Sequence, residues 1–344
     1  MDESNSDIQW PVGSTVDDIG PLWYLSYFTL VPCVIAGFIT NIFFIVVSQE
    51  VFNQRPTIPN LLLKYLAWTD VLNCSFGVVP IILAYHLKIF TKAVCAFHGT
   101  VFTAFSVASQ MIVALMSIDR YIALVHPFFY SKHLVKRHGK MAVAVYIIFV
   151  YSAVSASLPL WGLNKNVPHP PNSYCMFDWA DQTPKGRLVV YLNLLNTFLC
   201  LLIIMIMNGI VGLYMYRLRR LRPRQVACVS SETRTQRQED SFNRRLQLQM
   251  TKLTLVVAVV FFCCWFPFAF RILTNQLRVL ENEDADWFVS RLMAMNSVIN
   301  PFLYVIMWKP YRKGCWMLLK TCLHYLTCTF LNQPTMTLSE TVSL

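Results

Sequence analysis

Seven long apolar stretches constrain the fold of this chain more than any other feature of its sequence. A helix needs about 20 residues to cross the roughly 30 Å hydrocarbon layer of a membrane, and each stretch meets that length. Charged residues are only 14% of the chain, against roughly a quarter in soluble proteins. The sequence therefore predicts an all-α membrane protein with a seven-helix bundle over residues 22–307. The expected spans are Leu22–Ser48, Leu61–Tyr85, Ala93–Ile118, Met141–Leu163, Leu188–Tyr216, Leu253–Thr274 and Phe288–Met307.

The distribution of charge predicts the orientation of the bundle. Residues 1–21 contain acidic residues and no Lys or Arg, whereas residues 217–252 are rich in arginine. Because cytoplasmic loops carry the excess of basic residues, 217–252 is expected to be a long cytoplasmic loop and 1–21 an extracellular N-terminus. The net charge of +11 is then explained by topology and by contact with acidic membrane lipids, not by nucleic-acid binding. A multi-pass protein of the plasma membrane is the expectation.

The C-terminal part divides into two segments. Residues 308–326 alternate basic and apolar side chains, which predicts an amphipathic helix in the membrane interface. Residues 327–344 are rich in Thr and Ser and are expected to form a flexible, phosphorylatable cytoplasmic tail. Cys315, Cys322 and Cys328 lie beside the membrane, where either acylation or plain interfacial packing would explain them.

Three helix ends and interruptions are candidate conformational switches. Asp119-Arg120-Tyr121 ends the third stretch, where the carboxylate could hold Arg120 and release it when helices separate; interfacial snorkelling of the arginine is the alternative. Pro267 interrupts the sixth stretch and predicts a hinge, because proline removes a backbone hydrogen bond. Trp265 beside it could report ligand position to that hinge, or could simply fill the core. Asn300-Pro301 and Tyr304 interrupt the seventh stretch.

Polar residues within the apolar spans suggest a buried polar site. Asp70 in particular needs hydrogen bonds or a cation, because a buried carboxylate without either is costly. Oxygen atoms of Asp70, Ser109, Asn296 and Asn300 would suit a sodium ion or ordered water. A satisfied polar network without an ion is an equal alternative. No other cofactor or metal is expected.

Arg291 puts a cation near the start of the last apolar stretch. Such a charge is retained mainly where it faces a partner or a ligand. It lies nine residues before Asn300, which is about 13 Å along a helix and therefore near the outer rim. A guanidinium matches a carboxylate in a bidentate fork, so a lipid acid is one candidate partner. Pairing with Glu281, Asp284 or Asp286 of the adjoining loop is the alternative.

Together these landmarks resemble the rhodopsin-like G-protein-coupled receptors over nearly the whole chain. The landmarks are Asn41, Asp70, Cys95, Asp119-Arg120-Tyr121, Cys264-Trp265-Phe266-Pro267 and Asn300-Pro301-Phe302-Leu303-Tyr304. The resemblance implies a disulfide between Cys95 and Cys175 and a heterotrimeric G protein as partner, contacted by Arg120 and Phe128. Arrestin and receptor kinases are further partners that it implies.

The outer half of the chain resembles the prostanoid receptors more narrowly. Arg291 stands at the position of their carboxylate-binding arginine, with Tyr85 and Ser173 matching two other ligand contacts. Residues 270–277 look most like prostaglandin E receptors that raise cAMP, which implies prostaglandin E2 as ligand and a stimulatory G protein. The chain departs from the prostanoid pattern at Asp119, where glutamate is usual, and at Asn300, where aspartate is usual.

Other function classes fit the sequence less well. A receptor for a peptide or another lipid is the first alternative, whereas an amine receptor would need a carboxylate in the outer third stretch, which has none. A transporter would need charged or broken helices in repeat-related pairs. An enzyme is not expected, because the spans lack paired catalytic or metal-binding side chains.

Overall fold

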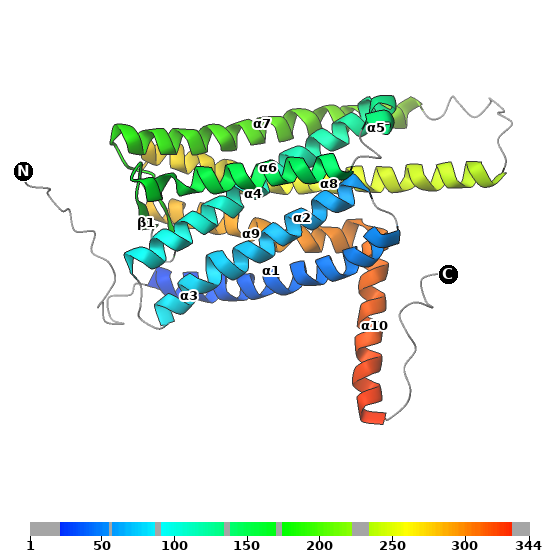
Figure 1. The fold of residues 1–344 in the computed structure, drawn as a ribbon, viewed down its shortest axis with the longest axis horizontal. Coiled ribbons are helices and arrows are strands. Elements are labelled where there is room, and N and C mark those ends of the chain that lie inside the picture. Colours follow the sequence, from blue (N-terminus) through cyan, green and yellow to red (C-terminus); the bar gives the residue numbers. More distant parts are fainter. Residues whose placement is uncertain are drawn as a thin grey trace, which may run out of the picture.

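A computed structural model describes residues 21–54, 57–86, 91–133, 138–169, 174–221 and 234–331. Long helices run side by side, with a short β-hairpin at one end of the bundle (Figure 1). The elements are α1 (Pro21–Gln54), α2 (Ile58–Leu72), the π-helix η2 (Asn73–Val78), α3 (Val79–His86), α4 (Lys92–Val125), α5 (Pro127–His133), α6 (His138–Ser157), the 3-10 turn η3 (Leu158–Trp161), β1 (Asn166–His169), β2 (Tyr174–Phe177), α7 (Pro184–Leu221), α8 (Arg234–Gln276), α9 (Glu283–Met307) and α10 (Lys309–Leu331).

The predicted bundle of seven crossings is confirmed. Within the described residues, six helices are each long and apolar enough to span a membrane: α1, α4, α6, α7, α8 and α9. The second crossing is formed by α2, η2 and α3 in succession, because a π-helical turn interrupts the α-helix just after Asp70. Large apolar side chains such as Ile147, Leu195 and Ile306 are exposed on the outside of the bundle, as lipid contact requires.

Helix α4 lies at the centre of the bundle and contacts α2, α6, α7, α8 and the hairpin. Its buried face carries small and polar residues as well as apolar ones, including Ser106, Ser109 and Ser117. Small side chains let neighbouring helices approach closely, which is how membrane helices pack without a hydrophobic driving force between them. Two of the sites below use polar side chains of this helix, Arg120 at its inner end and Ser109 in its middle.

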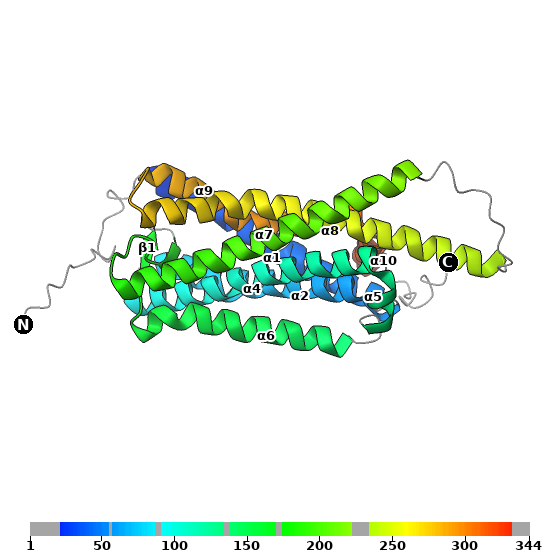
Figure 2. The ribbon, with the colours of Figure 1, turned by 90° about the horizontal axis from the view of Figure 1, so that it is seen from above.

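The long loop predicted at 217–252 is largely helical. Helix α7 continues to Leu221 and stops before Pro223, and α8 already begins at Arg234. Both helices project beyond the others at the same end of the bundle (Figure 2). A polar helix that leaves the membrane keeps its backbone hydrogen bonds and needs no apolar face. Hydropathy alone therefore could not show that α8 begins as early as Arg234. Residues 222–233 lie outside the described residues.

Helix α10 begins directly after α9, runs crosswise to the bundle helices and projects away from the bundle (Figure 1). This is the direction expected of an interfacial helix, although it ends at Leu331 and not at the predicted 326. Gly314 permits its close approach to α1, since a Cβ there would lie 2.5 Å from Val47 Cγ1. Residues 1–20 and 332–344, which include the predicted N-terminal segment and most of the tail, lie outside the described residues.

The hairpin is fastened to the end of the bundle by a disulfide, by Asn166 and by the ring of His98, which lies 3.0 Å from the Cys175 carbonyl oxygen. Strands β1 and β2 pair antiparallel, with Asn166 opposite Phe177. The expected disulfide joins Cys175 of β2 to Cys95 of α4. Asn166 donates from Nδ2 to Ala96 O (3.2 Å) and to Thr100 Oγ1 (3.3 Å). The hairpin therefore covers the end of α4 as a fixed lid.

Candidate functional site

Arg120 is held in a closed, buried cluster at the inner end of the bundle. Its Nε and NH2 groups donate to Asp119 Oδ2 at 2.9 and 2.5 Å. Tyr130 of α5 donates to Asp119 Oδ1 at 3.0 Å. Gln247 of α8 accepts a hydrogen bond from Arg120 NH1 at 3.0 Å. Arg120 is therefore buried and paired in the way that its sequence motif suggested, not snorkelling to the surface.

Two partners in this cluster were not predicted, Tyr130 and Gln247. Gln247 lies 18 residues before Trp265, which is about five helical turns and so the same face of α8. That spacing could have identified it.

The two other predicted residues of the inner end, Tyr121 and Phe128, are less buried than Arg120. The Tyr121 hydroxyl lies 3.4 Å from the His126 ring, and Phe128 is 90% exposed on α5. An exposed phenylalanine at this end is available to a partner protein.

Asp70 lies in a polar network in the middle of the bundle. Ser297 donates to Asp70 Oδ1 at 2.7 Å, and Asn300 donates to Oδ2 at 3.3 Å. Asn41 of α1 donates to the Ser297 carbonyl at 3.0 Å. The sequence identifies Ser297 and Asn41 as polar residues within the apolar spans, although neither was among the predicted oxygen ligands. The predicted polar network is therefore built mainly by α2 and α9.

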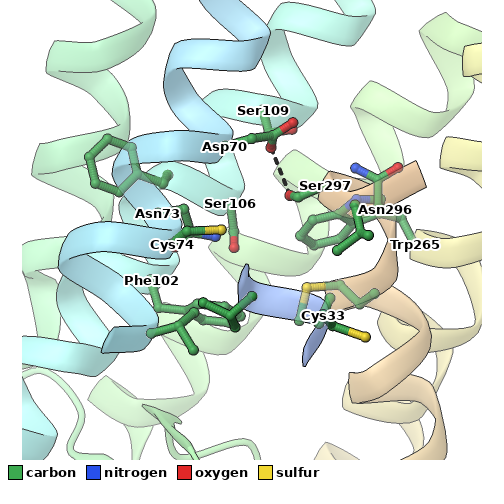
Figure 3. A pocket seen from close by; sticks show the side chains of 16 residues that line it. Cys33, Asp70, Asn73, Cys74, Phe102, Ser106, Ser109, Trp265, Asn296 and Ser297 are labelled. Carbon is green, nitrogen blue, oxygen red and sulfur yellow. Dashed lines mark hydrogen bonds between the residues drawn. The ribbon is translucent and has the colours of Figure 1, made fainter. Parts of the chain in front are cut away.

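A cavity of about 50 Å³ adjoins this network (Figure 3). Its wall includes Asp70, Ser109, Asn296 and Trp265. Ser109 Oγ and Asn296 Oδ1 are buried and have no hydrogen-bond partner among the described residues. A water needs about 10–15 Å³ of such space. A carboxylate with a hydroxyl and an amide oxygen suits a hard cation such as sodium, so the residues fit the predicted ion as well as water.

Trp265 and Pro267 lie in one continuous helix, α8. Trp265 is buried at the cavity wall, and its ring contacts Phe261 (5.6 Å between centroids) and Phe268 (5.9 Å). On α9, Pro301 is buried and Tyr304 is fully buried against Phe44 at 4.4 Å. The candidate switch residues of both helices thus face the interior, as their assigned roles require.

Arg291 lies on α9, next to Ser290, beneath the hairpin. Tyr174 of β2 hydrogen-bonds through its hydroxyl to Ser290 and is close enough to feel the charge of Arg291. Burial raises the pKa of Tyr174, while the Ser290 hydrogen bond and the Arg291 charge oppose that rise. Tyr174 is therefore a neutral O–H donor beside the guanidinium. Tyr85 lies in the last turn of α3 with its side chain outside the described residues, and Ser173 lies outside them altogether.

The alternative partner Asp286 is engaged elsewhere. Arg271 of α8 donates from Nε to Asp286 Oδ1 at 2.7 Å, and Asn275 donates to the other carboxylate oxygen at 2.9 Å. Arg271 also donates to the carbonyls of Leu280 (2.6 Å) and Asn282 (3.1 Å). Arg271 is therefore the residue that holds the 277–282 turn, a role that its sequence did not suggest.

A column of buried aromatic rings connects the hairpin to α8. His169 stacks on Tyr174 at 5.4 Å and on Trp179 at 4.1 Å, measured between ring centroids. Trp179 meets Phe268 edge to face at 5.4 Å. Burial lowers the pKa of His169 to about 4, so this ring is uncharged at neutral pH. His169 and Trp179 were not identified from the sequence.

The structure bears on one of the three candidate acylation sites. Cys315 is buried on α10, one residue after the close contact of Gly314 with α1. A buried thiol is not accessible to an acyl transferase, so packing explains Cys315 better than acylation does. The side chains of Cys322 and Cys328 lie outside the described residues.

Comparison with known proteins assigns the family. The model for the seven-transmembrane receptors of the rhodopsin family matches residues 27–304. The prostaglandin E2 receptor EP2 subtype of Canis lupus familiaris is 25% identical over 265 residues, which are 73% of this chain and 70% of that receptor. The human prostacyclin receptor is 27% identical over 276 residues, which are 77% of this chain and 67% of that receptor.

The fold comparison agrees with the sequence comparison. The crystal structure of squid rhodopsin superposes with a TM-score of 0.74 at 20% identity, covering 89% of this chain and 87% of that one. Members of the matched family are receptors and not enzymes, which confirms the expectation that the chain has no catalytic role. The seven crossings, the disulfide and the family match lead to one conclusion: the chain belongs to the rhodopsin family of seven-transmembrane receptors.

Proposed function

We propose that this receptor binds an extracellular lipid acid, with prostaglandin E2 as the ligand, and activates a stimulatory heterotrimeric G protein. The observation that carries the proposal is the position of Arg291 beside the neutral hydroxyl of Tyr174, under the hairpin lid. The carboxylate of Asp286, which could have paired with Arg291, is engaged by Arg271 instead. A lipid carboxylate matches the geometry of the Arg291 guanidinium in a bidentate fork, which is favourable in a low-dielectric site.

The names of the relatives support the same class of ligand. Prostaglandin E2 and prostacyclin, which the relatives' names give as ligands, are both lipid acids. The N-terminus is then extracellular, so that Arg291 and the hairpin face the outside. Receptor kinases and arrestin are expected partners of the tail at 327–344.

Signalling would follow from the two ends of the bundle acting together. In the closed cluster, Arg120 is occupied by Asp119 and Gln247. A ligand shifts the receptor toward a state with Arg120 free only if it binds that state more tightly. Trp265, at the cavity wall and two residues before Pro267, is the residue through which ligand contact would favour rotation of α8.

Sodium binding at Asp70 belongs to the same proposal. An ion held by Asp70, Ser109 and Asn296 would link α2, α4 and α9 in the closed state and so oppose agonist binding. Agonist affinity measured in sodium and in choline buffer tests this directly. Replacement of sodium by choline should raise affinity, and Asp70→Asn should abolish the difference; equal affinities in both buffers would contradict the ion site.

The ligand is tested by Arg291→Ala in transfected cells exposed to a panel of prostanoids, with cAMP and calcium as readouts. Loss of a charge-assisted hydrogen bond should lower agonist potency about tenfold or more. Arg278→Ala, in the exposed outer turn, is the matched control and should leave potency unchanged. Unchanged potency in Arg291→Ala at normal surface expression would contradict the carboxylate assignment. A fall in cAMP, or a calcium response alone, would contradict stimulatory coupling.

A further inference from the structure

Tyr174 lies where the candidate anion site meets the buried aromatic column. It is the first residue of β2, directly before the disulfide-bonded Cys175, so its backbone is fixed to α4. Only 6% of the residue is exposed. Its hydroxyl reaches Ser290, which adjoins Arg291 on α9, and its ring stacks on His169. The Tyr174 side chain therefore contacts both the candidate anion site and the aromatic column.

The hydrogen bond that Tyr174 makes is one that a carboxylate could replace. Ser290 donates its own proton to the Trp287 carbonyl at 2.7 Å, so its oxygen accepts the proton of Tyr174. If the tyrosine turned its O–H to a stronger acceptor, Ser290 would keep its bond to Trp287 and no donor would be left unsatisfied. A carboxylate is such an acceptor, because hydrogen bonds to charged groups are stronger than neutral ones.

The ring of Tyr174 has a continuous path of contacts to Trp265. His169 stacks on Tyr174, and Trp179 stacks on His169. Phe268 meets Trp179 and Trp265 edge to face, at 5.4 and 5.9 Å. Each of these rings is buried, so displacement of one requires adjustment of the next. The path crosses from the hairpin to α8 without passing through the cavity.

We propose that Tyr174 is a second hydrogen-bond donor to the ligand's carboxylate, and that its ring column signals the presence of that carboxylate to Trp265. The proposal rests on the lipid-acid function above and adds a selectivity of the receptor for acids. Lipid acids should activate the receptor, while neutral analogues of the same lipid should bind and activate it less. Tyr174 is a binding residue in this account, and His169 and Trp179 are positioning residues.

The role of the Tyr174 hydroxyl in ligand affinity is tested with Tyr174→Phe, which keeps the aromatic column and removes only the hydroxyl. Prostaglandin E2 and its methyl ester serve as probes, with binding measured on membranes. Affinity for the acid should fall about tenfold, equivalent to about 1.4 kcal/mol. Affinity for the ester should change less than twofold. Equal losses for both probes, or none for the acid, would overturn the role of the hydroxyl.

Arg291→Ala separates this inference from the function on which it rests. If Arg291→Ala lowers acid affinity and Tyr174→Phe does not, only the inference fails. If neither variant discriminates acid from ester, the lipid-acid function fails as well. In the double variant the acid affinity should be reduced by less than the product of the two single effects, because both side chains bind one carboxylate. A fully multiplicative loss would argue against a shared ligand group.

The role of the aromatic column in signalling is tested with Trp179→Leu. This variant interrupts the column at a ring that does not bind the ligand's carboxylate. The maximal response to the acid should fall by at least half at normal surface expression, while binding affinity stays within about threefold. Trp161→Leu, at an exposed tryptophan of η3, is the control and should preserve the response. A full maximal response in Trp179→Leu would overturn the signalling role.

Discussion

The outer and inner ends of α8 are held by different chemistry. At the outer end, Arg271 forms a buried ion pair with Asp286 and donates to two carbonyls of the adjoining turn. At the inner end, among the side chains that the structure describes, α8 is joined to α4 by a hydrogen bond from Arg120 to the uncharged Gln247. Arg120 already has its counter-ion, Asp119, on its own helix. The outer end is therefore fixed to α9, and the inner end is only lightly held.

This asymmetry would let α8 move as a lever about the hinge that the sequence predicts at Pro267. Gln247 lies 20 residues before Pro267, which is about 30 Å along the helix. A rotation of about 10° at the hinge would move the inner end by roughly 5 Å over that length. The neutral contact at Gln247 is the one that such a movement breaks. Three experiments would test the comparison.

Arg271→Ala should have the largest effect, because it leaves Asp286 as a buried charge without its cation. Removal of one partner of a buried pair typically costs about 3–5 kcal/mol. The thermal unfolding temperature of the purified receptor should fall accordingly, and surface expression should fall with it. Arg278→Ala, at an exposed arginine of the turn after α8, is the matched control. A destabilisation no larger than that of the control would show that the outer end is not fixed by this pair.

Acid should destabilise the outer end through His169. Burial lowers the pKa of His169 from 6.5 to about 4, although the charge of Asp286 acts in the opposite direction. Between those pH values the unfolded chain binds the proton and the folded chain does not, so stability is lost as pH falls from about 6.5 toward 4. The full loss would be about 3 kcal/mol.

The measurement is the unfolding temperature between pH 7.5 and 4.5, for the native receptor and for His169→Phe. The variant keeps a ring in the column and removes the titrating group, so its unfolding temperature should fall less steeply with acid. Parallel curves for the two proteins would mean that His169 is not the group responsible.

Gln247→Glu should have the smallest effect and should tighten the inner end. A carboxylate at this position would replace a neutral acceptor by a charged one opposite Arg120, stabilising the closed state by about 1–2 kcal/mol. That is roughly a 5- to 30-fold fall in the ratio of active to inactive receptor. Basal nucleotide exchange on the G protein should decrease, and agonist potency should decrease by a similar factor.

Gln249→Glu adds the same charge two residues away, on a different face of α8, and should leave both quantities unchanged. If both variants behaved alike, the effect would be one of general charge at the membrane surface. An increase in basal nucleotide exchange in Gln247→Glu would contradict the conclusion that the contact between Arg120 and Gln247 stabilises the closed state.

Much of the architecture was predictable because it depends on local composition. Apolar length identified the crossings, and the motifs around Trp265 and Asn300 were correctly assigned to helix interiors. The motif around Arg120 was predicted at a helix end, whereas α4 continues to Val125. The early start of α8 at Arg234 was missed because polar helices outside a membrane carry no hydropathy signal. Tyr130, Gln247 and Arg271 were missed because each is a partner from another element, and partner identity depends on how the helices are rotated against one another.

The sequence by itself determined the number of crossings, the family and the positions of the candidate switches, since these follow from apolar length and residue order. Only the tertiary structure decided which polar groups meet. It assigned Asp286 to Arg271, seated Ser297 on Asp70, and brought Tyr174 beside Arg291. The physical reason is that a buried polar atom must find its partner across a helix interface or under a folded loop, where distance along the chain carries no information.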